Sequence, residues 1–189
     1  MKITLPLMVI VLTVAIAVTA ICQQENITII EEPEMQTIDI KTSAFSEGEI
    51  IPVKYTCDSL DVSVPLVWSA PPEGTVSFAL ICDDPDAPMG TWVHWVLFNI
   101  PANITELPEG ISIADDSSFA SAVEGKNDFG KTEYGGPCPP RGPAHRYYFK
   151  IYALDTMLDL DKKADKADVE KAMKGHILAQ GQIMGKYKR

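Results

Sequence analysis

Residues 145–154, HRYYFKIYAL, alternate between apolar and polar side chains, and this period of two constrains the fold more than any other feature. Successive side chains of an extended strand point to opposite faces, so the segment predicts a strand with one buried face. Further runs rich in β-branched and aromatic residues follow at 76–82 and 92–100, and shorter strand-like runs lie at 50–55 and 62–69. Turns rich in proline and glycine separate them. The pattern predicts a mainly β, β-sandwich-like fold.

One helix interrupts this pattern late in the chain. Asp165 is positioned to cap residues 166–174, whose apolar side chains recur at helical spacing, and Gly175 is a typical helix stop. The segment after Gly175 is expected to return to extended structure. The loops at 103–116 and 124–143 are long for a compact domain, and long ordered loops are usually functional.

The first 22 residues are expected to be a signal peptide or an N-terminal membrane anchor. Residues 3–22 form an uncharged apolar run of about the length that crosses a bilayer. Lys2 precedes the run and acidic residues follow it, so the rest of the chain is expected outside the cytoplasm, secreted or anchored. Lipidation at Cys22 is a further alternative. Residues 23–37 are predicted to form an acidic tether, and residues 38–189 a single domain.

The formal net charge of −10 disfavours nucleic acid and acidic membranes as partners, because both would be repelled. Membrane contact would then depend on the N-terminal segment. Three cysteines remain after Cys22, too few for a disulfide scaffold. One bridge is permissible outside the cell, and Cys57 with Cys138 is the pair we favour. The sequons at Asn26 and Asn103 permit glycosylation if the host has the machinery.

His94 is an unusual residue for the apolar run WVHWVLFNI. A buried imidazole needs a hydrogen-bond partner, and Asp84 and Asp86 in the preceding turn are the nearest candidates. A core histidine bonded to a backbone carbonyl is the simpler alternative. Side chains two apart on a strand share a face, so Trp92 would lie beside His94. The turn and the start of this run form a first motif, DPDAP followed by WVH. In a second motif, GGPCPP followed by GPAHRY, His145 and Tyr147 repeat the spacing of Trp92 and His94.

The two motifs resemble those of the phosphatidylethanolamine-binding protein family, also called Raf kinase inhibitor-like, in its bacterial and archaeal branch. Flanking segments resemble the same branch: YTCD, PLVW, NDFG, YALD and GH. The resemblance covers nearly the whole of residues 38–189. It implies antiparallel sheets around a small preformed pocket. The pocket would bind anions such as phosphate or the phosphoethanolamine head group of a phospholipid. The protein would also bind proteases or kinases as an inhibitor. By motif match the pocket would be lined by Asp84, Pro85, Asp86, Trp92, His94, Gly136, Pro139, His145 and Tyr147.

Aspartates appear unsuited to an anion site, so at least one is expected to be protonated or engaged in orienting a histidine and turn amides. The histidines, and amides near the glycine pair 135–136, would then face the anion. This predicts affinity that strengthens as histidine protonates near its ordinary pKa of about 6.5.

We therefore expect a non-catalytic binding protein that needs no cofactor. One alternative is an extracytoplasmic protease inhibitor that acts through the pocket rim and the 103–143 loops. Another is an enzyme using Asp84, Asp86, His94 and His145 as metal ligands or as an acid–base set. No motif supplies a nucleophile with its base, nor the spacing of a helical zinc site.

Overall fold

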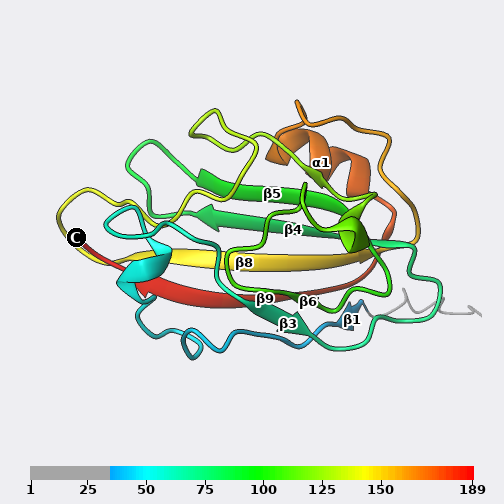
Figure 1. The fold of residues 1–189 in the computed structure, drawn as a ribbon, viewed down its shortest axis with the longest axis horizontal. Coiled ribbons are helices and arrows are strands. Elements are labelled where there is room, and N and C mark those ends of the chain that lie inside the picture. Colours follow the sequence, from blue (N-terminus) through cyan, green and yellow to red (C-terminus); the bar gives the residue numbers. More distant parts are fainter. Residues whose placement is uncertain (1–34) are drawn as a thin grey trace, which may run out of the picture. The chain divides into compact units, whose positions relative to one another are not determined.

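The computed structural model describes residues 35–189. Its main element is a six-stranded sheet in which four long strands lie side by side (Figure 1). All neighbouring strands are antiparallel except the first pair, β1 and β9, which run parallel. The order across the sheet is β1 (Gln36–Thr37), β9 (Ile177–Tyr187), β8 (His145–Leu154), β4 (Ser77–Asp84), β5 (Trp92–Pro101) and β7 (Val123–Glu124).

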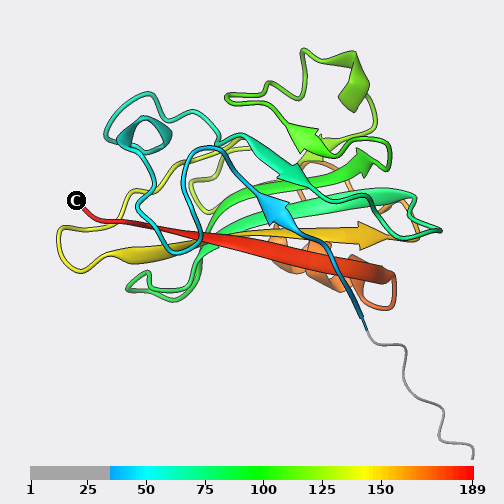
Figure 2. The same cartoon turned by 90° about the horizontal axis from the view of Figure 1, so that it is seen from below.

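The central strand β4 is buried along its whole length because both faces of the large sheet are covered. Phe78 and Leu80 point into a core shared with a three-stranded antiparallel sheet of β2 (Ile40–Lys41), β3 (Leu66–Trp68) and β6 (Glu106–Leu107). Ala79 and Ile81 point into a second core, under the helix α1 (Lys166–Met173). Figure 2 shows the small sheet and the helix on opposite faces. The predicted mainly β fold with one late helix is confirmed.

The helix forms where its end signals predict it. Asp165 caps it with a full capping box, in which the Asp165 carboxylate accepts from the Asp168 backbone N–H and the Asp168 side chain accepts from Asp165 N–H. Val169 and Met173 are buried against the sheet. Gly175 then adopts φ +86, a left-handed conformation that favours glycine, and β9 follows.

The predicted strand at 50–55 is wrong. Only Ile50 makes a ladder contact, a single bridge to Lys186, and Val53–Tyr55 form a 3₁₀ turn, η1. Pro52 explains the break, since proline lacks the N–H that would continue a ladder. A second 3₁₀ turn, η2, covers Ser117–Phe119.

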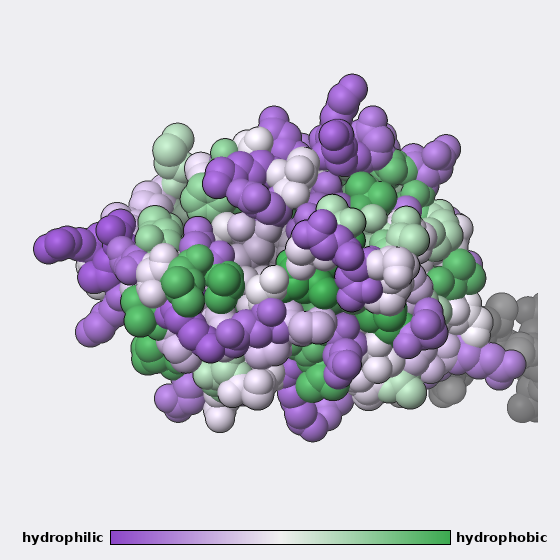
Figure 3. Space-filling view, in the orientation of Figure 1, coloured by the Kyte–Doolittle hydropathy of each residue, from purple (hydrophilic) through white to green (hydrophobic). Residues whose placement is uncertain are grey.

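The first strand among the described residues is β1. Gln36 and Thr37, assigned above to the end of the tether, pair with Ala179 and Gln180. The export segment, Cys22 and the Asn26 sequon lie outside the described residues. Within residues 35–189 no helix has the length and apolar character needed to cross a membrane. Asn103 is exposed, and hydrophilic residues are spread over much of the face in Figure 3.

Candidate ligand-binding site

A pocket of about 390 Å³ opens where the β4–β5 turn, the start of β8 and the 135–143 loop meet. Both imidazoles of the two motifs line it, one from β5 and one from β8. Its walls are mostly apolar. Among residues 35–189 no lysine or arginine belongs to the lining, so the histidines are the groups there that can become cationic. The lining residues are Asp84, Ala87, Pro88, Met89, Trp92, His94, Phe129, Cys138, Pro139, Pro140 and His145.

Asp84 orients His145, the imidazole from β8. His145 Nδ1 lies 2.7 Å from Asp84 Oδ2, and both side chains are buried. The other carboxylate oxygen, Oδ1, accepts from the Asp86 backbone N–H at 2.8 Å. Both carboxylate oxygens are thus used within the protein, which leaves Nε2 of His145 as the ring nitrogen available to a ligand. This arrangement is the one expected of an aspartate that orients a histidine and a turn amide.

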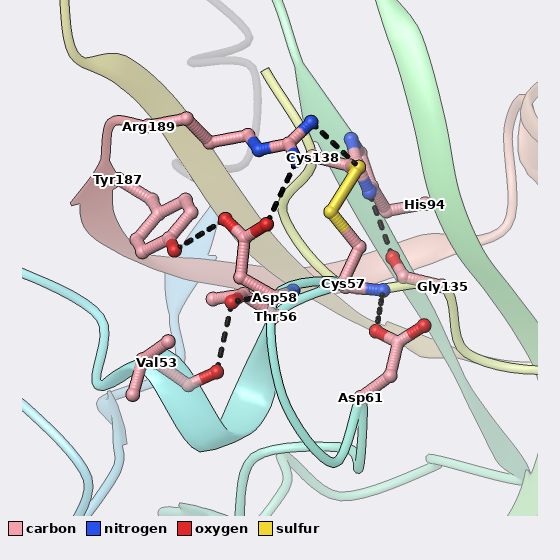
Figure 4. Close-up of a disulfide and its surroundings, with 11 residues drawn as sticks. Val53, Thr56, Cys57, Asp58, Asp61, His94, Gly135, Cys138, Tyr187 and Arg189 are labelled. Atoms are coloured by element: carbon pink, nitrogen blue, oxygen red, sulfur yellow. Dashed lines mark hydrogen bonds and ion pairs between the residues drawn. A yellow bond between two sulfur atoms is a disulfide. The ribbon is translucent and has the colours of Figure 1, made fainter. Parts of the chain in front are cut away.

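His94 is held by a backbone group rather than by an aspartate. Its Nδ1 donates to the Gly135 carbonyl at 2.7 Å (Figure 4), so the partnership expected with Asp84 or Asp86 is wrong. Burial lowers the pKa of this imidazole below its ordinary value, although the bond to Gly135 opposes the shift. With Nδ1 occupied, Nε2 is again the free nitrogen.

Trp92 lies on the pocket side with His94, as the strand period requires. Tyr147 does not line the pocket. Its ring lies under that of His94, with centroids 5.2 Å apart, and is fully buried. Burial raises the pKa of its hydroxyl, and the nearby charge of Asp84 adds to the shift. Tyr147 therefore supports the imidazole through ring packing.

The turn residues Pro85 and Asp86 also lie outside the lining. Asp86 faces Arg146, with Nη2–Oδ1 2.6 Å and Nε–Oδ2 2.8 Å, and these bonds lower the pKa of Asp86 to about 2. The pair fastens the turn to β8. Because Asp86 is turned away, the four side chains of the enzyme alternative do not converge. In residues 35–189 no group of three or more potential ligands is arranged to hold a metal ion.

Gly136 fills a packing role rather than the expected ligand role. Its N–H already donates to Asp61 Oδ1 at 2.7 Å, so it is not free for an oxyanion. A Cβ at this position would lie 2.3 Å from both that oxygen and the Tyr55 carbonyl. Glycine is required because the 55–61 segment crosses so closely.

Of the nine residues expected from motif matching, the pocket brings together Asp84, Trp92, His94, Pro139 and His145. Most of the residues missed are neighbours within the same motifs: Ala87, Pro88, Met89, Cys138 and Pro140. Phe129 comes from the NDFG segment, which contributes to the family resemblance but was not predicted to line the pocket. Its ring lies edge-on to both Trp92 and His94, at 5.5 and 5.4 Å.

A disulfide reaches the pocket through Cys138, which belongs to the lining. Cys57 and Cys138 are bonded, with S–S 2.07 Å, and this is the favoured pair (Figure 4). The chain end packs beside it: Asp58 accepts from Tyr187 Oη at 2.8 Å and pairs with Arg189 at 2.9 Å. The described residues contain one free cysteine, Cys82, which is buried in β4.

The sheets and pocket define a class of molecule, a mainly β domain with a small preformed pocket at the ends of its central strands. Comparison with known proteins makes the class specific. The sequence model of the family described as phosphatidylethanolamine-binding protein matches residues 41–188. The chain is 49% identical over 152 residues to a UPF0098 protein of Methanothermobacter thermautotrophicus, covering 80% of this chain and 99% of that protein. A UPF0098 protein of Aquifex aeolicus is 49% identical over 154 residues, covering 80% and 89%.

Two solved structures agree. The phosphatidylethanolamine-binding protein homologue CT736 of Chlamydia trachomatis has a TM-score of 0.74 and 38% identity, covering 82% of this chain and 99% of that one. Escherichia coli YbcL, described as a new member of the mammalian PEBP family, has a TM-score of 0.75 and 35% identity, covering 80% and 98%. The chain belongs to the phosphatidylethanolamine-binding protein family, and is a binding-type protein.

Proposed function

We propose that the pocket binds a small anionic group, inorganic phosphate or the phosphoethanolamine head group of a phospholipid, without catalysing a reaction. The observation that carries the proposal is the convergence of two imidazoles whose Nδ1 atoms are both occupied. Each leaves Nε2 for the ligand, and each can become a cationic donor by taking up a proton. Asp84 holds the His145 ring through Nδ1, while the apolar walls exclude competing water.

Replacing one imidazole tests the pocket directly. We expect His145→Gln to weaken phosphate binding at least about tenfold, because a charge-assisted hydrogen bond to the anion is lost. Isothermal titration calorimetry with phosphate measures this. His176→Gln is the matched control, since His176 is exposed and pairs with Asp155 outside the pocket. Unchanged affinity in a folded His145→Gln variant would remove the assignment.

The proposal also predicts a direction of pH dependence. Burial lowers the pKa of His94, so the free protein holds this ring neutral at neutral pH, and a bound anion favours the protonated ring. Binding then takes up protons, and affinity falls as pH rises, by up to about tenfold per pH unit for each proton taken up. Sulfate is the suitable probe because its own charge stays constant from pH 5.5 to 8. Affinity that is flat or rises with pH contradicts the role of the histidines.

A second candidate function is inhibition of an extracytoplasmic protease or another protein. It is favoured by the apolar rim, where Met89 is 95% exposed and Phe129 41% exposed. A protein partner would then contact the rim and loops, so Met89→Ser would weaken its binding while His145→Gln would not. The Cys57–Cys138 bridge supports a place outside the cytoplasm, because disulfides persist in oxidising compartments.

A further inference from the structure

A second cavity of about 470 Å³ shares no lining residue with the ligand pocket. It is acidic: three carboxylate residues line it, and no lysine or arginine from residues 35–189 does. The apolar part of its wall comes from Val62, Ile111 and the ring of Tyr134. The full lining is Asp61, Val62, Ser63, Gly110, Ile111, Ser112, Glu124, Thr132, Glu133 and Tyr134.

Two of the three carboxylates are each held by one fixed donor. Asp61 accepts from Gly136 N–H through Oδ1 (Figure 4), and Glu124 accepts from Trp95 Nε1 through Oε1 at 3.0 Å. One oxygen of each therefore remains available. Burial raises the pKa of Glu124, and the nearby charge of Glu133 adds to this, while the Trp95 bond opposes it. A half-buried carboxylate beside another negative charge is stabilised by a cation.

Ser63 is an independent indication of a ligand. The residue is 4% exposed and lines the cavity, and its Oγ has no hydrogen-bond partner in the part of the chain that the structure describes. Ser63 lies between Val62, which also lines the cavity, and Val64, which belongs to the hydrophobic core. A buried hydroxyl without a partner costs free energy, which a polar ligand group would recover.

The protein's own Lys131 shows which cation suits the site. Its Nζ lies 2.9 Å from Glu133 Oε1, and Asp61 also contributes to raising the pKa of this ammonium, after Glu133. The Lys131 side chain is 64% exposed, so a competing ammonium group could displace it at little cost. An ammonium group is thus already attracted to these carboxylates.

We infer that this cavity is a binding site for a protonated alkyl amine, whose ammonium group contacts Glu124, Glu133 and Asp61 and whose alkyl chain lies against Val62, Ile111 and Tyr134. Ser63 Oγ accepts a hydrogen bond from the ammonium group. The volume, well above that of a single ion, and the apolar wall favour an organic cation over a metal.

Calorimetry with 1,4-diaminobutane at physiological salt tests the site on the intact chain. We expect saturable one-to-one binding, which Glu124→Gln weakens about tenfold because a charged partner is lost while the acceptor for Trp95 is kept. Lys131→Gln should strengthen binding about threefold, since it removes an exposed competing ammonium. Ser63→Ala should weaken binding without lowering the unfolding midpoint.

Lys126→Gln is the matched control for Lys131→Gln, because Lys126 is exposed and does not line the cavity, so affinity should not change. Absence of saturable binding by the unsubstituted protein overturns the inference. So does equal affinity in Glu124→Gln and the unsubstituted protein, which would leave only general attraction to an acidic surface. Binding of calcium in place of the diamine would likewise overturn it.

Discussion

Removal of the Cys57–Cys138 disulfide is expected to lower the free energy of unfolding by about 4 kcal/mol. The two cysteines are 81 residues apart in the sequence, so the bridge closes a long loop in the unfolded chain and removes much of its conformational entropy. Because both cysteines are replaced together in Cys57→Ser/Cys138→Ser, no unpaired thiol remains to form other disulfides. Urea unfolding under oxidising conditions measures the change.

The reduced unsubstituted protein supplies the matched comparison. A dithiol reductant should lower its stability by a similar amount and leave the double variant unaffected. Phosphate affinity should fall in parallel, because Cys138 lines the pocket and Pro137 O accepts from Cys57 N–H across the same junction. A stability loss below about 1 kcal/mol would mean that the bridge does not constrain the unfolded chain as a long-loop crosslink should.

Much of the fold could be predicted from the sequence because local and long-range signals agree. Residues 145–154 alternate with period two, so Tyr147, Phe149 and Ile151 enter the core shared with the small sheet, while the side chains between them lie on the other face. The helix could be predicted from Asp165 and Gly175, since end signals are local. The conformation of residues 50–55 was predicted wrongly, because Pro52 interrupts the strand that the β-branched residues of this segment favour.

The histidines of the site and the orienting role of an aspartate were predictable, but the partner of each histidine was not. Trp92 and His94 share a face by strand geometry alone, so their common pocket follows from the sequence. The acceptor for His94 is the carbonyl of Gly135, 41 residues away, and a backbone carbonyl has no sequence signature. Asp86 was misassigned because its partner Arg146 comes from a strand that becomes its neighbour only on folding.

A buried ion cluster joins the helix to the sheet. Asp83 on β4 is 1% exposed, and its Oδ2 lies 2.8 Å from Lys150 Nζ on β8 and also pairs with Lys166 on α1. Its other oxygen, Oδ1, has no hydrogen-bond partner among residues 35–189. The two ammonium groups therefore compensate a carboxylate that water does not reach.

We expect Lys150→Met/Lys166→Met to lower the free energy of unfolding by about 3–5 kcal/mol, because it leaves a buried carboxylate without a counter-charge. The triple variant that adds Asp83→Leu should regain most of this loss, since replacing a whole buried ion cluster with apolar side chains is often nearly neutral. Urea unfolding of both variants at pH 7 measures the difference. A triple variant that is no more stable than the double would contradict this account. The lysines would then contribute through the packing of their alkyl stems rather than through their charge, and Asp83 would not hold α1 on the sheet electrostatically.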